Sequence, residues 1–516
     1  MLEEERKFEV DARFAMPDLT PHLPAGGRII ARPPLRLRAT YYDTADLRLA
    51  RAGASLRHRR GDDEPWTVKL PTATPGVRHE ISRSGPAAQP PQFLLDLVLA
   101  LTRGAPVAPV GSLSTVRRAY QLLDADDQML VEVVDDAVSV LHDRRVRQTF
   151  REVEAERKGG GRKLLGHVSK ALLAAGARMG TDGFVPKHVR ALGEEARQAP
   201  DWPAAPGRPG RKASAGEVVT TAVQRDIARI ISHDPLVRLR APVGDDDTAV
   251  HQMRVGCRRL RSDLRTFDVL VKRRWARALR DEVGWLARLL GAARDAEVLR
   301  ARLRRTAEAD TLATLDAAAV ARIDADLAAR HEEALTRLDE AMRGPRYLTL
   351  LETLLAAARA PQLTDRATEP AAVVLPHLIY KPWHRLAAGS RHDPGAGDLD
   401  PAARDEVWHA VRIHGKRARY ATDAVADVLG GRAGDLAAAL GSVQDLLGEH
   451  QDAVLAGESW LAIADGDPDD HVLAVTAGRL FERERAAVRA ARTAFPGAWR
   501  RASRRRLTRW LYEGHG

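Results

Sequence analysis

The chain has 516 residues, and its 81 Lys+Arg against 70 Asp+Glu give a formal net charge of +11. This length corresponds to about two to four domains, and a hydrophobic content of 44% excludes wholesale disorder. The single cysteine excludes an internal disulfide framework. The segment Met1–Lys7 has no apolar core of a signal peptide, and no apolar run approaches the length of a membrane span. We therefore expect a cytoplasmic protein whose basic charge favours polyanionic partners.

Residues 1–190 are predicted to form mostly strands, because short runs alternate polar and apolar side chains. These runs are Glu3–Val10, Ala54–Arg60, Trp66–Leu70, Met129–Val140 and Thr149–Arg157. Two stretches of this half are predicted to be helical instead, Pro91–Thr102 and Lys163–Ala177. A segment rich in Pro, Gly and Ala follows at 196–216, and its composition predicts a linker.

From residue 217 onward the alternation gives way to apolar residues at helical spacing. The predicted helices are Glu217–Ser232, Thr248–Lys272, Trp275–Arg305, Leu312–Met342, Leu348–Ala360, Ala402–Leu429, Asp435–Leu447 and Gly478–Thr493. This half of the chain is therefore predicted to be an all-α bundle.

Two segments of the helical half repeat each other at nearly constant spacing. One basic pattern begins at His251 and recurs 158 residues later at His409. Its matched positions are Arg254 and Arg412, Arg258 and Lys416, Arg259 and Arg417, and Arg261 and Arg419. The pattern LLGxxxD also recurs, with Gly291 and Asp295 matching Gly448 and Asp452. We infer an internal duplication, with repeats at about 217–365 and 371–512.

The basic pattern has a definite geometry on a helix. At about 100° per residue, positions i, i+3, i+7 and i+10 share a stripe about 80° wide. Cations crowded on one stripe repel each other, so a polyanion or facing carboxylates must neutralise them. A solvated basic face is the alternative for a single helix, but two helices with the same order favour a binding surface. Asp295 and Asp452 are interpreted as partners that orient the arginines rather than as metal ligands.

These motifs resemble the CHAD (conserved histidine alpha-helical) domain family over roughly residues 217–510. The resemblance implies two helical repeats that bind inorganic polyphosphate in a basic groove without catalysis. The residues that it implies as polyphosphate contacts are His251, Arg254, Arg258, Arg261, His409, Arg412, Lys416 and Arg419.

Charged residues also follow the predicted strands of the first half. Glu3, Glu5 and Lys7 share one face of the first strand, and Glu152, Glu154 and Glu156 share one face of the last. Cations occupy the strands between them, at Arg57, Arg59, Lys69, Arg78 and Arg118. Carboxylates suit hard divalent cations, whereas Arg and Lys suit phosphate oxygens. A closed barrel lined by both would hold a metal–phosphate complex, and a solvated sheet face is the alternative.

The opening pattern Glu3-x-Glu5-x-Lys7 resembles that of the CYTH, or triphosphate tunnel metalloenzyme, family. The agreement continues through YYDT, LRHR, VKL, RHE, EVEAE and PKHVR, and covers about residues 1–192. The resemblance implies an eight-stranded antiparallel tunnel that binds triphosphates with Mg²⁺ or Mn²⁺. The metal ligands that it implies are Glu3, Glu5, Glu152 and Glu154. The phosphate-binding residues that it implies are Lys7, Arg57, Arg59, Lys69, Arg118 and Lys187.

Two assignments within this site stay open in the sequence. Either Glu5 or Glu154 would position the attacking water as a catalytic carboxylate. The acidic position ahead of the last strand is Glu132, Asp135 or Asp136.

Taken together, the sequence predicts an α+β protein of two domains: an antiparallel β-barrel tunnel of about eight strands at 1–195, then the linker, then an all-α bundle of two repeated units at 217–512. The predicted function is metal-dependent hydrolysis of inorganic triphosphate by an enzyme tethered to polyphosphate, in the cytoplasm and at polyphosphate granules. The alternatives are a non-catalytic polyphosphate-sensing protein, a nucleoside or thiamine triphosphatase, and an adenylyl cyclase. No membrane partner is expected, and nucleic acid is disfavoured because no aromatic series interleaves with the basic stripes. The oligomeric state is left open.

Overall fold

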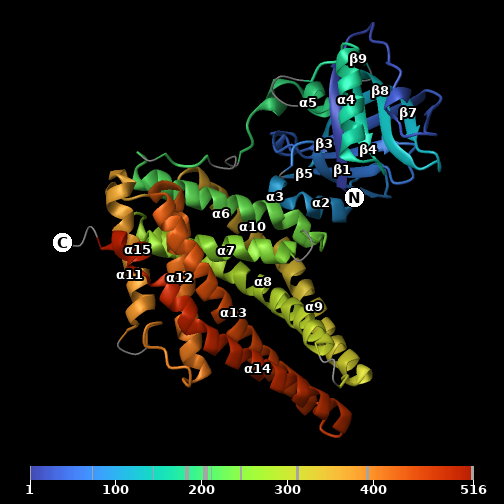
Figure 1. The fold of residues 1–516 in the computed structure, drawn as a ribbon. Coiled ribbons are helices and arrows are strands. Elements are labelled where there is room, and N and C mark those ends of the chain that lie inside the picture. The colour runs from blue at the N-terminus through green and yellow to red at the C-terminus, as the bar shows by residue number, and fades with distance from the viewer. Residues whose placement is uncertain are drawn as a thin grey trace. The chain divides into compact units, whose positions relative to one another are not determined.

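The computed structural model describes residues 2–72, 74–142, 145–179, 185–201, 207–210, 212–243, 247–309, 313–390 and 394–512. The chain divides into two compact units, Met1–Asp201 and Trp202–Gly516, which we call the barrel unit and the helical unit (Figure 1). Of the predicted linker 196–216, residues 202–206 and 211 lie outside the described residues, as does Leu312 of the predicted helix Leu312–Met342.

The barrel unit contains nine antiparallel strands among its described residues. They are β1 (Leu2–Val10), β2 (Arg28–Ala31), β3 (Leu35–Asp43), β4 (Ser55–Arg60), β5 (Trp66–Pro71), β6 (Val77–Arg83), β7 (Ala108–Leu123), β8 (Met129–His142) and β9 (Arg145–Arg157). Eight of them close in the order β7-β3-β4-β5-β6-β1-β9-β8, because β8 pairs back onto β7. The short β2 adds to β7 beside β3. The prediction of an eight-stranded antiparallel barrel is confirmed.

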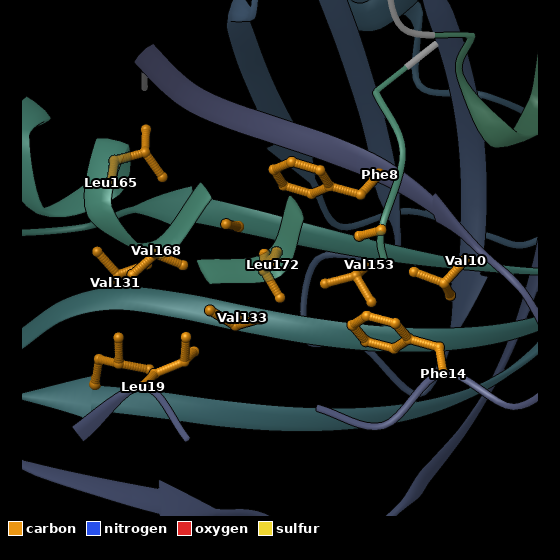
Figure 2. Packing of buried hydrophobic residues seen from close by; sticks show 13 residues of the cluster. Phe8, Val10, Phe14, Leu19, Val131, Val133, Val153, Leu165, Val168 and Leu172 are labelled. Carbon is orange, nitrogen blue, oxygen red and sulfur yellow. The ribbon is translucent and has the colours of Figure 1, made fainter. Parts of the chain in front are cut away.

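Apolar residues on the outer face of β1, β8 and β9 are covered by α4 (Arg162–Ala174), as Figure 2 shows. The buried side chains of this cluster include Phe8, Val131, Val133 and Val153 from the strands and Leu165, Val168 and Leu172 from α4. Burial of each large side chain contributes about 1.5–3 kcal/mol. Because side chains alternate along a strand, the residues between these apolar positions point into the barrel.

Short helices complete the barrel unit. They are α1 (Arg48–Arg51), α2 (Gln92–Leu97), α3 (Leu99–Thr102), α5 (Lys187–Leu192) and the 3₁₀ turns Thr20–His22 and Glu194–Arg197. Ala196 is buried in a cluster with Val189 of α5 and Leu47. Asp201 forms an ion pair with Arg103. The first residues of the predicted linker therefore pack on the barrel unit.

The helical unit is all-α, as predicted. Its elements are α6 (Ala215–Arg238), α7 (Ala249–Thr266), α8 (Arg273–Glu308), α9 (Ala317–Arg343), α10 (Pro345–Arg359), α11 (Ala371–Ala388), α12 (Asp405–Leu429), α13 (Gly431–Asp465), α14 (His471–Ala502), α15 (Arg505–Thr508) and the 3₁₀ turns Asp365–Thr368 and Arg509–Leu511. The sequence periodicity does not predict α11, and it predicts α13 and α14 too short.

The helices follow the order of the inferred duplication. In the first half α7 packs on α6 and α8, and in the second half α12 packs on α11 and α13. The pairs α8–α9 and α13–α14 form long hairpins (Figure 1). Helices α7 and α12 carry the two basic patterns and contact each other. No helix in the described part of the chain is long and apolar enough to span a membrane.

Candidate functional site

Three charged side chains of β1 face the interior of the barrel. Glu3, Glu5 and Lys7 are 7%, 6% and 9% exposed, while Phe8 lies on the opposite face of the strand, under α4 (Figure 2). Charged groups buried to this degree need ionic partners. Neighbouring strands and α5 supply them.

One group of partners comes from β9, β8 and α5. The strand register places Lys7 opposite Glu154, and Lys7 Nζ lies 2.6 Å from Glu154 Oε1 and 3.0 Å from Glu5 Oε1. Lys187 Nζ lies 3.3 Å from Glu152 Oε1 and 3.4 Å from Glu154 Oε1, and it also pairs with Asp136. Two lysines and several carboxylates thus meet on one part of the inner wall.

The structure corrects one predicted cation. The side chain of Arg118 is half exposed and lies 3.9 Å from Asp135. Its neighbour Arg117 donates from Nε and Nη2 to the two carboxylate oxygens of Asp136 at 2.9 and 2.7 Å, and lies 3.5 Å from Glu154. Adjacent residues of a strand point to opposite faces. Arg117, and not Arg118, therefore lines the interior.

The same alternation separates Asp135 from Asp136, while Glu132 shares the inner face with Asp136. Asp135 accepts hydrogen bonds from Arg151, whose guanidinium also donates to the backbone oxygen of Phe14 outside the barrel. Asp136 is fully buried and pairs with Arg117 and Lys187. Asp136, and not Asp135, thus joins the interior group.

The facing part of the inner wall comes from β4, β5 and β6. Lys69 Nζ lies 2.6 and 2.8 Å from the two carboxylate oxygens of Glu3, and 3.1 Å from Glu80. Arg57 lies 3.6 Å from Glu80, and Arg78 lies 3.9 Å from Glu5. Arg59 shares the inner face with Arg57 and pairs with Asp62. The other predicted phosphate-binding residues therefore line the interior.

The carboxyl groups inside the barrel differ in their pKa values. Burial raises the pKa of Glu152 to about 7, against the opposing charge of Lys187. Burial raises the pKa of Glu3 to about 7 as well, against Lys69. Burial also acts on Glu154, but Lys187, Lys7 and Arg117 outweigh it and hold the pKa of this carboxyl well below its usual range. Groups that titrate near pH 7 beside a permanently ionised one suit proton transfer at neutral pH.

The donor set fits a divalent cation in its chemistry. Glu152 is 1% exposed, and neither of its carboxylate oxygens accepts a hydrogen bond in the described part of the chain. Glu154 and Asp136 lie beside it through their shared contact with Lys187, and hard oxygen ligands are those that Mg²⁺ and Mn²⁺ bind. Among the described residues no three acidic, His or Cys side chains converge into a ready-made cage, because the lysines separate them.

A second group of charged residues lies in the helical unit, where α7 and α12 contact each other (Figure 1). Arg258 on α7 lies 5.3 Å from the ring centre of Tyr420 on α12. Burial, followed by the charges of Arg412, Arg258 and Arg254, lowers the pKa of Lys416 to about 7. The predicted cations of both repeats therefore gather in one place, which we call the basic cluster. Its predicted members are Arg254, Arg258, Arg261, Arg412, Lys416 and Arg419.

Several buried hydrogen-bond donors of this cluster lack an acceptor among the described residues. The buried Nε atoms of four of its arginines make no hydrogen bond to any described residue, namely those of Arg258, Arg261, Arg412 and Arg419. A buried donor without an acceptor costs about 1–3 kcal/mol. A bound polyanion would supply the acceptors and relieve the repulsion at the same time.

Arginines of the basic cluster pass over glycines of α8 and α13, a placement that was not predicted from the sequence. A Cβ at Gly284 would lie 3.3 Å from the guanidinium of Arg261, and one at Gly441 would lie 3.7 Å from that of Arg419. Arg254 likewise passes Gly291. The matched spacing of these glycines in the two repeats is the signal that would have found them.

The aspartates of the LLGxxxD pattern contact the cluster. Asp295 accepts a hydrogen bond from Arg254 at 3.1 Å, and Asp452 lies 3.9 Å from Arg412. The predicted histidines sit at its margin. His251 is half-buried, and burial followed by the charge of Arg294 lowers its pKa. His409 is exposed and hydrogen-bonds Gln451 at 2.6 Å.

Comparison with known proteins follows the two units. The sequence matches the CYTH domain over residues 1–182 and the CHAD domain over residues 221–462. Proteins from two strains of Mycobacterium tuberculosis are 31% identical over 509 residues, which cover 94% of this chain and 93% of each relative.

Solved structures resemble parts of the chain. PptA from Streptomyces chartreusis matches 56% of this chain and 100% of its own, with 24% identity and a TM-score of 0.45. HpAC1 from Hippeastrum, an adenylyl cyclase by name with a dominant triphosphatase activity, matches 34% of this chain and 88% of its own, with 16% identity and a TM-score of 0.20. By its two domain matches and its full-length relatives, the chain belongs to the proteins that join a CYTH domain, of the triphosphate tunnel metalloenzyme family, to a CHAD domain.

Proposed function

We propose that the protein is a metal-dependent triphosphatase acting on inorganic triphosphate, and that its helical unit holds it on inorganic polyphosphate. The observation that carries the first part is the inner wall of the barrel, where buried Lys and Arg side chains alternate with buried carboxylates. The CYTH match supports the same reading. A cytoplasmic location, including polyphosphate granules, belongs to this proposal.

The residues divide by chemical type. Phosphate oxygens would be held by Lys7, Arg57, Arg59, Lys69, Arg117 and Lys187, which now pair with carboxylates and would exchange them for phosphate. Glu3, Glu5, Glu152 and Glu154 would hold the divalent cation, together with Asp136. Bound Mg²⁺ or Mn²⁺ supplies charge neutralisation and polarises the phosphoryl group.

The reaction is attack of water on the terminal phosphorus, in line with the bridging oxygen. The bond from phosphorus to the bridging oxygen breaks, and the products are phosphate and diphosphate. A carboxylate of Glu5 or Glu154 orients the water. The pKa of Glu154 stays well below the usual range because burial is outweighed by Lys187 and Lys7, so this carboxylate is ionised at neutral pH.

Phosphate release from inorganic triphosphate, ATP and thiamine triphosphate, each with Mg²⁺, Mn²⁺ or EDTA, tests the proposal. We expect metal-dependent release that is fastest with inorganic triphosphate and falls by about 10²-fold or more in Glu5→Gln. Preference for ATP or thiamine triphosphate would identify a nucleotide or thiamine triphosphatase instead, and release of diphosphate together with cyclic AMP from ATP would identify a cyclase. Silence on every substrate, with polyphosphate binding intact, would identify a non-catalytic receptor.

Arg117 and Arg118 provide a matched pair for this experiment. Arg117→Ala removes a cation from the inner wall and should lower kcat/KM for triphosphate by about tenfold or more, since charged hydrogen bonds contribute about 1.5–3 kcal/mol. Arg118→Ala changes the adjacent residue on the outer face and should leave kcat/KM within about twofold. Equal losses in both variants would contradict the assignment of the inner wall as the phosphate site.

The second part of the proposal rests on the basic cluster and its leftover donors. Retention on immobilised polyphosphate, challenged by free polyphosphate or by DNA at equal phosphate concentration, tests it. We expect polyphosphate to elute the protein and DNA to elute little of it. Elution by DNA with little elution by polyphosphate would identify the helical unit as a nucleic-acid-binding module.

A further inference from the structure

The two repeats of the helical unit differ in charge at one matched pair of positions. Arg265 on α7 occupies the place that Asp423 occupies on α12, 158 residues later. Asp423 lies 3.6 Å from Arg259 and 3.8 Å from Arg419. Because Arg259 matches Arg417 in the duplication, the equivalent contact in the other half joins Arg265 to Arg417. An ion pair at one end of the basic cluster is thus replaced by two cations at the other.

The end with two cations is hollow. A cavity of about 630 Å³ lies against the C-terminal part of α7, α11 and α12. Its basic lining residues include Arg265, Arg417, Arg385 and Lys381. Asp268 is the acidic residue among those that line it. In the described part of the helical unit, none of the three arginines forms an ion pair with a carboxylate.

The cations around this cavity destabilise one another's charged forms. Burial, followed by Arg417, Arg280 and Arg261, lowers the pKa of Arg265. Burial, followed by Arg385 and Arg280, lowers the pKa of Arg417. Arg280 Nε is buried and makes no hydrogen bond within the described residues. A multiply charged anion in the cavity would offset the repulsion between Arg265 and Arg417.

The opposite end has carboxylates beside its cations. Asp423 pairs there with both Arg259 and Arg419. Asp263 also lies 3.3 Å from Arg225. These carboxylates repel a phosphate chain, whereas the arginines around the cavity have no ion pair among the described residues. The two ends of the basic cluster are therefore chemically unequal.

We propose that bound polyphosphate leaves the basic cluster at one end only, through this cavity, where Arg265, Arg385 and Arg417 bind further phosphates of the chain. Arg265 follows Arg261 by one turn of α7, so the cluster and the cavity are continuous. This inference rests on the proposed polyphosphate binding and adds to it a direction and a second phosphate subsite.

Charge-reversal and charge-removal variants of the full chain test it with long-chain polyphosphate in EDTA. Arg265→Asp, which makes the two ends alike, should weaken binding by about tenfold or more and flatten its salt dependence. Arg385→Gln, an exposed change that leaves the helix packing alone, should weaken binding in the same sense. Arg277→Asp on the exposed side of α8 alters net charge equally and should change affinity by less than about twofold.

The variant Asp423→Asn tests the other end of the basic cluster, away from the cavity. It should not lower the affinity, since the chain does not pass Asp423. A loss with Asp423→Asn equal to that with Arg265→Asp would overturn the one-ended path, and so would parent-like binding by both Arg265→Asp and Arg385→Gln. If the parent itself fails to bind polyphosphate, the proposed function falls rather than the path. Helical circular dichroism and a thermal unfolding transition equal to those of the parent verify that each variant keeps its helical unit folded.

Discussion

At the scale of single residues, Lys416 makes polyphosphate binding depend on pH. Burial and three neighbouring arginines lower its pKa to about 7, so at pH 8 it is largely neutral in the unbound protein. Bound polyphosphate brings negative charge to the ammonium group and raises its pKa. Binding at pH 8 should therefore take up protons, up to about one from this residue, and should weaken as the pH rises from about 7 to 9.

Calorimetry of polyphosphate binding at pH 8 in two buffers of different ionisation enthalpy measures this uptake. Lys416→Arg supplies the control, because arginine keeps its charge throughout this range. The variant should lose the part of the uptake that belongs to Lys416, while contributions from His251 remain in both proteins. Equal proton uptake by the parent and by Lys416→Arg would contradict the assignment.

Alternation along single strands predicted much of the barrel site. Glu3, Glu5 and Lys7 share the inner face as expected, while Glu4 between them pairs with Arg157 and Arg162 instead. The same rule failed at Arg117 and Arg118, because two adjacent arginines look alike unless the register of their strand is known. The pKa of Lys416 was beyond prediction for a different reason. It depends on Arg254 and Arg258 of the other repeat, and only the packing of α7 against α12 brings them near.

At the scale of elements, Gly284 in α8 lowers helix stability where the Arg261 guanidinium passes closely. Gly284→Ala should stabilise the isolated helix by about 1 kcal/mol, but its Cβ would lie 3.3 Å from the Arg261 guanidinium and displace it. We expect unfolding stability to stay equal or rise while polyphosphate affinity falls by about two- to fivefold, or about 0.4–1 kcal/mol. Chemical denaturation and binding measured on the same preparation would separate the two effects.

Gly478 of α14 offers the matched substitution. A Cβ at Gly478 would meet no neighbouring atom within 4 Å, so Gly478→Ala should stabilise the protein without changing its affinity. If both alanine variants bind polyphosphate as the parent does, the glycines serve helix packing and not the arginines.

Element prediction succeeded where one periodicity ran without interruption. The strands β1, β4, β5, β8 and β9 and most long helices were found in this way. Helix α11 was missed because it carries Pro376 and Pro382, which normally end a helix. The 16-residue strand β7 was missed because it pairs with β2, β3 and β8 at different points, and its burial pattern therefore changes along its length.

At the scale of the whole molecule, the boundary between the units decides which fragments can be tested. The CYTH match ends at residue 182, but Lys187 of α5 pairs with Asp136 and Glu152 inside the barrel. Arg51 donates to the backbone oxygen of Ala199 at 2.8 Å, and Arg103 pairs with Asp201. A fragment that ends at 201 keeps these contacts, whereas one that ends at 182 leaves buried carboxylates without Lys187 and should be unstable.

Fragments 1–201 and 202–516 then test whether the barrel unit is held on polyphosphate through its covalent link to the helical unit. Triphosphate hydrolysis by 1–201 should stay within about twofold of the full chain, since the proposed phosphate and metal ligands all lie in that fragment. After the proteins are applied to polyphosphate beads and washed, the full chain should leave triphosphatase activity on the beads. An equimolar mixture of the two fragments should leave almost none, because 202–516 binds while 1–201 washes away. Activity retained by 1–201 alone would mean that the barrel holds polyphosphate itself, and the helical unit would then need another role.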